Sequence, residues 1–207
     1  MPKALKKAGM LVAACLFCML VSGWTEDLKS IQKTMSGVQS ISADVVQKKH
    51  LKILSKPLSS QGHFLYQAPD SLRWEYSSPI KSIVLVHAGI VKRYVWKENG
   101  FIEDTSVKLE AVRIVMGQIS KWFQGRFEDN TDFTGVIKPG DPFRIVLTPR
   151  NDTIKGFITE VVITFSQTPG VVSAIEIIEQ QGTSTVLEFH GVVLNHPIPE
   201  RLFENVQ

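Results

Sequence analysis

The chain has 207 residues, of which 43% are hydrophobic and 21% charged, and its mean hydropathy is +0.04. This composition is that of an ordinary globular protein and excludes intrinsic disorder, collagen and a coiled coil. The formal charge of +3 comes from residues 1–23, which hold three lysines and no acidic residue, so the other 184 residues carry 20 basic and 20 acidic side chains. A nearly neutral chain lacks the electrostatic footprint of a nucleic-acid-binding protein.

The N-terminus has the pattern of an export signal. Three lysines precede an uncharged apolar run over residues 9–21, and Val21-Ser22-Gly23 supplies the small residues of a cleavage site. We therefore predict a signal peptide over residues 1–23 and a single domain over residues 24–207. Two alternatives stay open, a retained membrane anchor and a lipid-modified Cys15. Both cysteines lie in this segment, so we expect no disulfide in the exported chain.

Periodicity predicts a short helix from Thr25 to Gly37, followed by strands that turn residues separate. A second helix over residues 107–124 has one apolar stripe and is expected to end at Gly125. Asn99-Gly100 is the strongest hairpin signal. The expected strands are 41–45, 63–67, 72–76, 81–87, 91–96, 133–137, 143–148, 157–165, 171–179 and 184–194.

These elements predict a mostly β protein with some helix, built on one large curved antiparallel sheet of ten or eleven strands. A meandering sheet of this size must curl, close or split into two layers. Several strands are apolar on both faces, such as Ile83–Val86. Periodicity leaves open whether the inside of the curl is filled or hollow.

No motif of catalysis or of cofactor binding is present. The chain has no Gly-x-Ser-x-Gly elbow, no Walker loop and no Gly-x-Gly-x-x-Gly. The five histidines, at positions 50, 63, 87, 190 and 196, are not at zinc-helix spacing and stand beside no pair of carboxylates. The sequence therefore predicts no catalytic residue, no metal, no cofactor and no enzyme activity.

One stretch carries a family resemblance. It runs Phe64-Leu-Tyr66, Ala68-Pro69 and Leu72-Arg73-Trp74-Glu75-Tyr76, after an upstream Ser42-Ala43-Asp44-Val-Val-Gln47 and a Lys56-Pro57 segment that leads to Gly62. Together with the signal peptide and the opening helix, this order resembles the periplasmic outer-membrane lipoprotein carrier family (LolA-type proteins).

The resemblance implies a half-open β-barrel whose concave apolar surface is covered by helices. It also implies a monomeric periplasmic carrier, which takes acylated lipoproteins from an inner-membrane ABC transporter to an outer-membrane acceptor. An acyl chain of about 15 methylenes in water costs on the order of 12 kcal/mol, so such cargo needs an apolar cavity. Two alternatives remain: a carrier of another envelope lipid, and a regulatory module that senses lipid or lipoprotein on the same fold.

On this interpretation we expect a set of apolar side chains to line the acyl cavity, with simple core packing as the alternative for each. Met116 is the leading candidate for contact with a mobile chain, because methionine adapts to irregular apolar ligands. Family members often have an arginine where this chain has Ala68, so we expect a lid held mainly by apolar contact. The predicted cavity residues are Phe64, Tyr66, Leu72, Trp74, Tyr76, Leu85, Leu109, Val112, Met116, Ile119, Phe123, Ile163 and Phe165.

Overall fold

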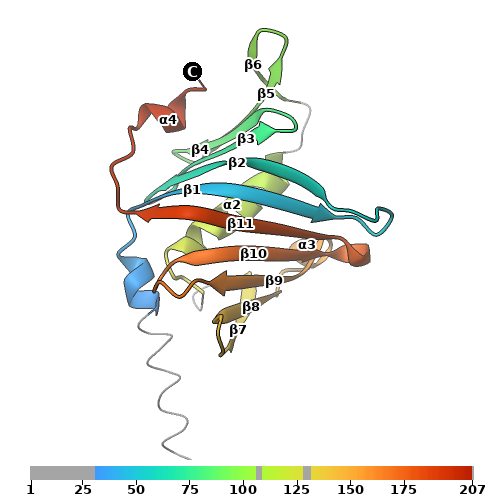
Figure 1. Ribbon diagram of the computed structural model, residues 1–207, viewed down its shortest axis with the longest axis vertical. Coiled ribbons are helices and arrows are strands. Elements are labelled where there is room, and N and C mark those ends of the chain that lie inside the picture. The colour runs from blue at the N-terminus through green and yellow to red at the C-terminus, as the bar shows by residue number, and fades with distance from the viewer. Residues whose placement is uncertain (1–30, 106–108, 128–131, 207) are drawn as a thin grey trace, which may run out of the picture.

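The fold is organised around one antiparallel sheet, and the computed structural model describes residues 31–105, 109–127 and 132–206. Within these residues the sheet has eleven strands in the order β6-β5-β4-β3-β2-β1-β11-β10-β9-β8-β7. Because β6 and β7 are the two ends of this order, the sheet curls without closing (Figure 1). The strands are β1 (Ser40–His50), β2 (Leu58–Gln67), β3 (Ser71–Ser78), β4 (Ser82–His87), β5 (Ile90–Lys97), β6 (Gly100–Glu103), β7 (Phe133–Lys138), β8 (Arg144–Pro149), β9 (Ile158–Phe165), β10 (Val172–Glu179) and β11 (Ser184–Leu194).

This architecture confirms the predicted fold class, a mostly β protein with one large, incompletely closed antiparallel sheet. Residues 31–36 are helical, which agrees with the described part of the predicted opening helix. The remaining helices are α2 (Leu109–Phe123), α3 (Asp152–Lys155), the 3₁₀ turn η1 (Gln180–Gly182) and α4 (Arg201–Glu204). The predicted signal peptide lies outside the described residues. In the described part of the chain, no helix is both long and apolar enough to cross a membrane.

The core lies on one face of the sheet, which we call the inner face. Strand register aligns side chains across neighbouring strands: Ala43 pairs with Phe64, and Phe64 pairs with Trp74. Since side chains alternate between faces along a strand, this register puts the largest apolar residues of β1, β2 and β3 on the same side. The same alternation continues through β11, β10, β9 and β8, where Phe189, Ile163 and their neighbours are buried.

Helix α2 covers the inner face and ends as predicted (Figure 1). Its last turn buries Ile119, Trp122 and Phe123. At its end, Gly125 has a φ of 71° and donates its N–H to the Trp122 carbonyl over 3.0 Å, while the Arg126 N–H reaches the Lys121 carbonyl over 3.0 Å. These two bonds form a Schellman motif, which requires a left-handed residue at this position.

The outer face of the sheet holds the C-terminal segment. Helix α4 lies over β3 and β4, where Phe203 is 1% exposed. Arg73 precedes Trp74 in β3, so its side chain points to the opposite face. It donates from Nη1 to the backbone carbonyls of Leu202 over 3.0 Å and Asn205 over 2.8 Å. Its guanidinium also pairs with Glu75 at 2.8 Å. One buried arginine thus anchors the C-terminal segment to the sheet.

Several local features differ from the sequence prediction. β1 ends five residues after the predicted position 45, and β2 begins five residues before the predicted position 63. The β5–β6 hairpin forms, but Lys97 pairs with Gly100, so Glu98 and Asn99 are the turn residues and Glu98 has a φ of 45°. Helices α3 and α4 each have only four residues, too few for a periodic pattern to reveal them. In α3, Asn151 is the N-cap and accepts the Thr153 N–H over 2.8 Å.

Arg73→Ala should release the C-terminal segment, because it leaves two backbone carbonyls without their donor. We expect the free energy of unfolding to fall by about 2–3 kcal/mol, since hydrogen bonds to charged groups contribute roughly that much. Urea unfolding measures the loss, and hydrogen exchange should accelerate in residues 196–206. Arg150→Ala is the matched control, because Arg150 is exposed and has one side-chain bond, to Thr134. Equal losses in both variants would contradict the anchoring role.

Candidate functional site

An aromatic cluster occupies the centre of the inner face. The ring centroids of Phe64 and Trp74 lie 5.1 Å apart in an edge-to-face arrangement. Phe123, from the last turn of α2, enters this cluster and lies 5.3 Å from Phe64, 5.7 Å from Phe189 and 6.4 Å from Tyr66. Aromatic pairs in these geometries contribute about 0.5–1.5 kcal/mol beyond area burial. Phe123 therefore links α2 to the centre of the sheet, while Trp122 contacts Phe133 of β7 with ring centroids 5.8 Å apart.

Most of the predicted cavity residues come together here. Tyr76 and Met116 are half-buried and pack against the cluster. Phe189, which the sequence analysis did not single out, belongs to the same cluster, and its alternation with Leu187 in β11 is the signal that identifies it. The fully buried members among the predicted residues are Phe64, Tyr66, Leu72, Trp74, Ile119, Phe123, Ile163 and Phe165.

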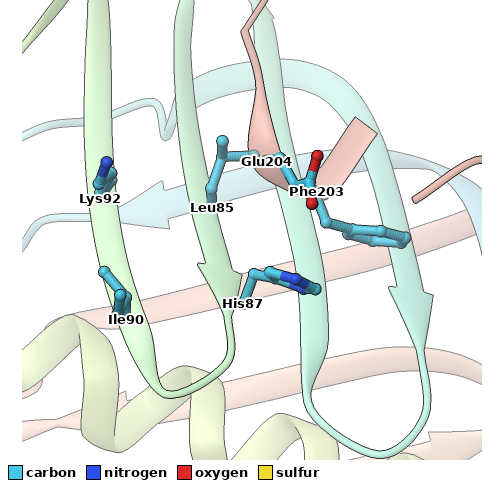
Figure 2. A pocket seen from close by; sticks show the side chains of 6 residues that line it. All are labelled: Leu85, His87, Ile90, Lys92, Phe203 and Glu204. Carbon is cyan, nitrogen blue, oxygen red and sulfur yellow. The ribbon is translucent and has the colours of Figure 1, made fainter. Parts of the chain in front are cut away.

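Leu85 is separated from this set. It pairs with Arg73, whereas Trp74 pairs with Val84, so the side chain of Leu85 points to the outer face. There it lines a 130 Å³ pocket together with Phe203, His87 and other residues near α4 (Figure 2). The prediction that Leu85 lines the inner cavity is therefore wrong, because successive residues of a strand point to opposite faces and Leu85 is on the outer one. Leu109 and Val112 lie in α2, but their side chains are outside the described part of the structure.

A pocket opens beside the middle of α2. Its volume is about 220 Å³, and its apolar wall is made by Leu72, Val86, Val91 and Met116. Leu72 also belongs to the buried core cluster, so the pocket reaches the edge of the inner apolar layer.

Hydrogen bonds tie the end of α2 to the β2–β3 turn. Gln124 Nε2 donates to the Tyr66 hydroxyl over 2.6 Å and to the Pro69 carbonyl over 3.0 Å. The Tyr66 hydroxyl in turn donates to the Pro69 carbonyl over 3.2 Å. We call this group, Gln124, Tyr66 and the Pro69 carbonyl, the α2 latch. The expectation of a mainly apolar lid contact is therefore incomplete, because a side chain of the helix reaches the turn that carries Ala68.

The sequence alone does not reveal this latch, for a physical reason. Gln124 falls on the polar side of the helical pattern, which predicts contact with water. Only the tertiary structure brings the β2–β3 turn next to that side. Ala68 itself has a different role, because its backbone N–H donates to the Gln39 carbonyl over 2.8 Å.

Tyr76 adds a polar group at the edge of the cluster. Its hydroxyl donates to Gln47 Oε1 over 2.6 Å, and its ring centroid lies 6.2 Å from that of Trp74. Burial raises the pKa of Tyr76 to about 12, because the phenolate would lose its hydration. Tyr76 therefore stays neutral and apolar in character across the physiological pH range. An inner layer without a resident charge suits an apolar ligand.

The sequence as a whole matches one family model over residues 36–206, that of the outer membrane lipoprotein carrier protein LolA. This range includes every described strand of the sheet and the whole of α2. The chain belongs to the LolA family. Proteins of this family are carriers rather than enzymes, which agrees with the absence of catalytic motifs from the sequence.

Individual relatives of this LolA-family chain are distant. An outer-membrane lipoprotein carrier protein of Helicobacter hepaticus is 22% identical over 191 residues, which cover 90% of this chain and 83% of that protein. A LolA superfamily protein from Nitrosomonas europaea is 12% identical with a TM-score of 0.43, and the match covers 86% of this chain and 97% of that one. The Mycobacterium tuberculosis lipoprotein LppX is 12% identical with a TM-score of 0.46, covering 84% and 96%.

Gln124→Leu should loosen α2, because it removes the two latch bonds that Gln124 Nε2 donates while nearly keeping the size of the side chain. A net loss of about 1–1.5 kcal/mol corresponds to roughly five- to tenfold more frequent opening. Hydrogen exchange of residues 116–123 measures this change. Gln180→Leu is the matched control, because Gln180 Nε2 also donates to a backbone carbonyl, that of Lys155, away from α2. Unchanged hydrogen exchange in the Gln124→Leu variant would show that the latch does not hold the helix.

Proposed function

We propose that this LolA-family chain binds the acyl chains of lipoproteins, or of related envelope lipids, between α2 and the inner face of the sheet. The observation that carries the proposal is the apolar layer that runs from β3 to β8 and that α2 covers. This layer matches a ligand class whose transfer out of water gains about 0.8 kcal/mol per methylene.

Ligand entry requires α2 to move. The pocket beside Met116 has about 220 Å³, whereas sites for drug-sized ligands have roughly 300–1,000 Å³. An acyl chain therefore fits only if α2 lifts and Phe123 leaves the aromatic cluster. The described structure is the closed state in this proposal, with α2 occupying the place of the cargo.

Closure of α2 is opposed by one of its own residues. Trp122 is 2% exposed, and its indole N–H has no hydrogen-bond partner among the described residues. A buried unsatisfied donor costs about 1–3 kcal/mol. When α2 lifts, water can satisfy this N–H. The cost therefore offsets part of the stabilisation from Phe123 and the latch, which keeps the free-energy gap between closed and open states small.

The remaining parts of the proposal follow from the family and the N-terminal pattern. Residues 1–23 would direct export, and the domain over residues 24–207 would work as a monomer in the periplasm. It would accept acylated lipoproteins from an inner-membrane ABC transporter and deliver them to an outer-membrane acceptor. A carrier of another envelope lipid and a lipid-sensing module remain the alternatives. Mass spectrometry of material that co-purifies from the periplasm separates them by the chemistry of the bound lipid.

Met116→Asp tests whether the pocket is the entry to the acyl site. Met116 is half-buried, so a carboxylate there stays hydrated, and we expect the midpoint of thermal unfolding to change by only a few degrees. The affinity for an environment-sensitive fatty-acid probe should fall at least tenfold, because the charge lies where an acyl chain enters. Met116→Leu is the control and should keep the affinity. Equal affinities in the two variants would place the site elsewhere.

Phe123→Ala tests whether α2 competes with the cargo. We expect thermal stability to fall, since truncating a buried phenylalanine costs about 3–5 kcal/mol, and the affinity for the fatty-acid probe to rise. Phe203→Ala is the matched control, because Phe203 is equally buried but on the outer face. It should lower stability without raising affinity. A parallel loss of stability and affinity in Phe123→Ala would mean that the cluster is only a core.

A further inference from the structure

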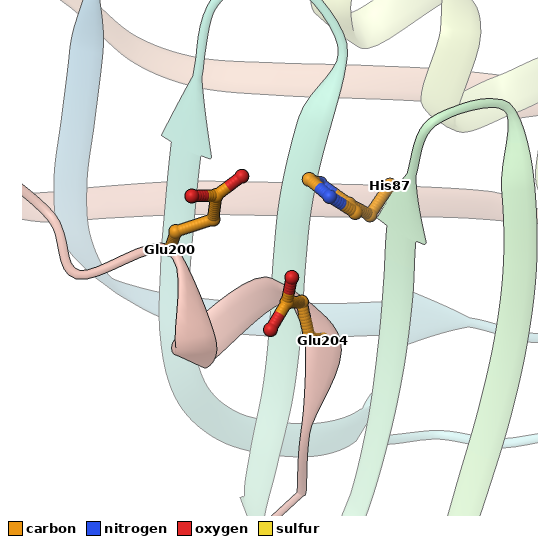
Figure 3. A group of neighbouring side chains, drawn as sticks. All are labelled: His87, Glu200 and Glu204. Atoms are coloured by element: carbon orange, nitrogen blue, oxygen red, sulfur yellow. The ribbon is translucent and has the colours of Figure 1, made fainter.

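Three metal-ligand side chains converge on the outer face, at the junction of β4 and α4. One ligand atom each from His87, Glu200 and Glu204 lies within 4.8 Å of the other two. His87 ends β4, while the two glutamates come from the C-terminal segment (Figure 3). Among the described residues, this is the one group of three potential metal ligands whose ligand atoms lie this close together.

We propose that His87, Glu200 and Glu204 bind a divalent transition-metal ion such as Zn²⁺, which fastens α4 to β4. One imidazole and two carboxylates are a ligand set that zinc uses, with a fourth position left for water. Around a tetrahedral zinc, such ligand atoms lie about 3.4 Å apart. Glu200 and Glu204 are exposed, so their side chains can turn to close the remaining distance.

The orientation of His87 supports the site independently of the two glutamates. Ser71 Oγ lies 2.8 Å from His87 Nδ1, and Ser71 is 8% exposed. The hydroxyl oxygen of Ser71 can accept a hydrogen bond from a protonated Nδ1 of His87. In that tautomer Nε2 carries no proton, and its lone pair can bind a metal. Metal-binding histidines are commonly fixed in this way by a group outside the ligand set. Ser71 lies on β3, so the ring of His87 is held by the sheet itself and not by the segment that carries the two glutamates.

The arrangement of the two glutamates points the same way. They are four residues apart, and Glu200 already has helical φ and ψ angles of −55° and −36°, so both side chains lie on one side of the α4 turn. Among the described residues, no ion pair joins either carboxylate to a cationic side chain. Two neighbouring carboxylates repel each other unless a cation lies between them.

Room for a further ligand exists next to the group. The 130 Å³ pocket of Figure 2 is lined by His87, Lys92 and Glu204, with Leu85, Ile90 and Phe203 as its apolar wall. This pocket can hold the water that completes the coordination of the metal. The site lies on the face opposite the proposed acyl layer, so it does not depend on the proposed function.

The test uses the mature chain without a histidine tag, stripped with EDTA. Titration with Zn²⁺ in a calorimeter should show one ion per chain, and Co²⁺ should give a visible absorption band from nitrogen and oxygen ligation. At a hundredfold excess over the dissociation constant, Zn²⁺ should raise the midpoint of thermal unfolding by about 5–10 °C. Hydrogen exchange should slow in residues 200–206.

Glu204→Gln and His87→Gln should each abolish the stoichiometric binding and the change in exchange. Glu204→Gln keeps the shape of an exposed side chain, so its loss of binding cannot come from misfolding. His63→Gln is the control, because His63 is another outer-face histidine beside a carboxylate, with Nδ1 3.1 Å from Asp44. It should bind Zn²⁺ as the original chain does. Absence of binding in the original chain, or binding that survives Glu204→Gln and His87→Gln, overturns the proposal.

Discussion

The insertion of Phe123 into the aromatic cluster of the inner face is the contact on which the rest of the structure depends. Eleven strands in one antiparallel order leave a broad apolar surface, and a single long helix covers its centre. Without this contact, Phe64, Trp74 and Phe189 would face water over an area that monomeric proteins rarely expose.

The two faces of the sheet hold their helices in different ways. On the outer face, the C-terminal segment is anchored by a buried charge, Arg73, whose bonds reach two backbone carbonyls. On the inner face, α2 is held by dispersion contacts and by the latch at Gln124, while the buried Trp122 N–H opposes closure. A charged anchor suits a segment that stays in place, and apolar contacts with one polar latch suit a helix that moves.

The proposed acyl-binding layer rests on the continuity of the buried apolar cluster and not on any single residue. Tyr76 and Leu72 lie at one side of the layer and Ile163 at the other, so that a long flexible chain can be accommodated in several places. Apolar burial is non-directional, which makes it suitable for cargo that differs in protein part but shares its acyl chains. Membership of the LolA family agrees with this physical picture.

The sequence by itself predicted most of the strands, the described part of the opening helix, α2 and most of the inner layer. Alternation of apolar residues with a period of two revealed the strands, and it put Phe64, Trp74 and their neighbours on one face, because neighbouring antiparallel strands keep this alternation in register. The same rule went wrong for Leu85, since a strand that is apolar on both faces carries no signal of which residue points inward.

Only the tertiary structure decided which distant polar groups meet. Gln124 looked like a solvent-facing residue until the β2–β3 turn came next to it, and His87 looked isolated until the C-terminal α4 placed Glu200 and Glu204 beside it. Hydrogen bonds and metal ligands act over about 2–3 Å. Residues far apart in the chain reach such distances only through the packing of whole elements, which local periodicity does not encode.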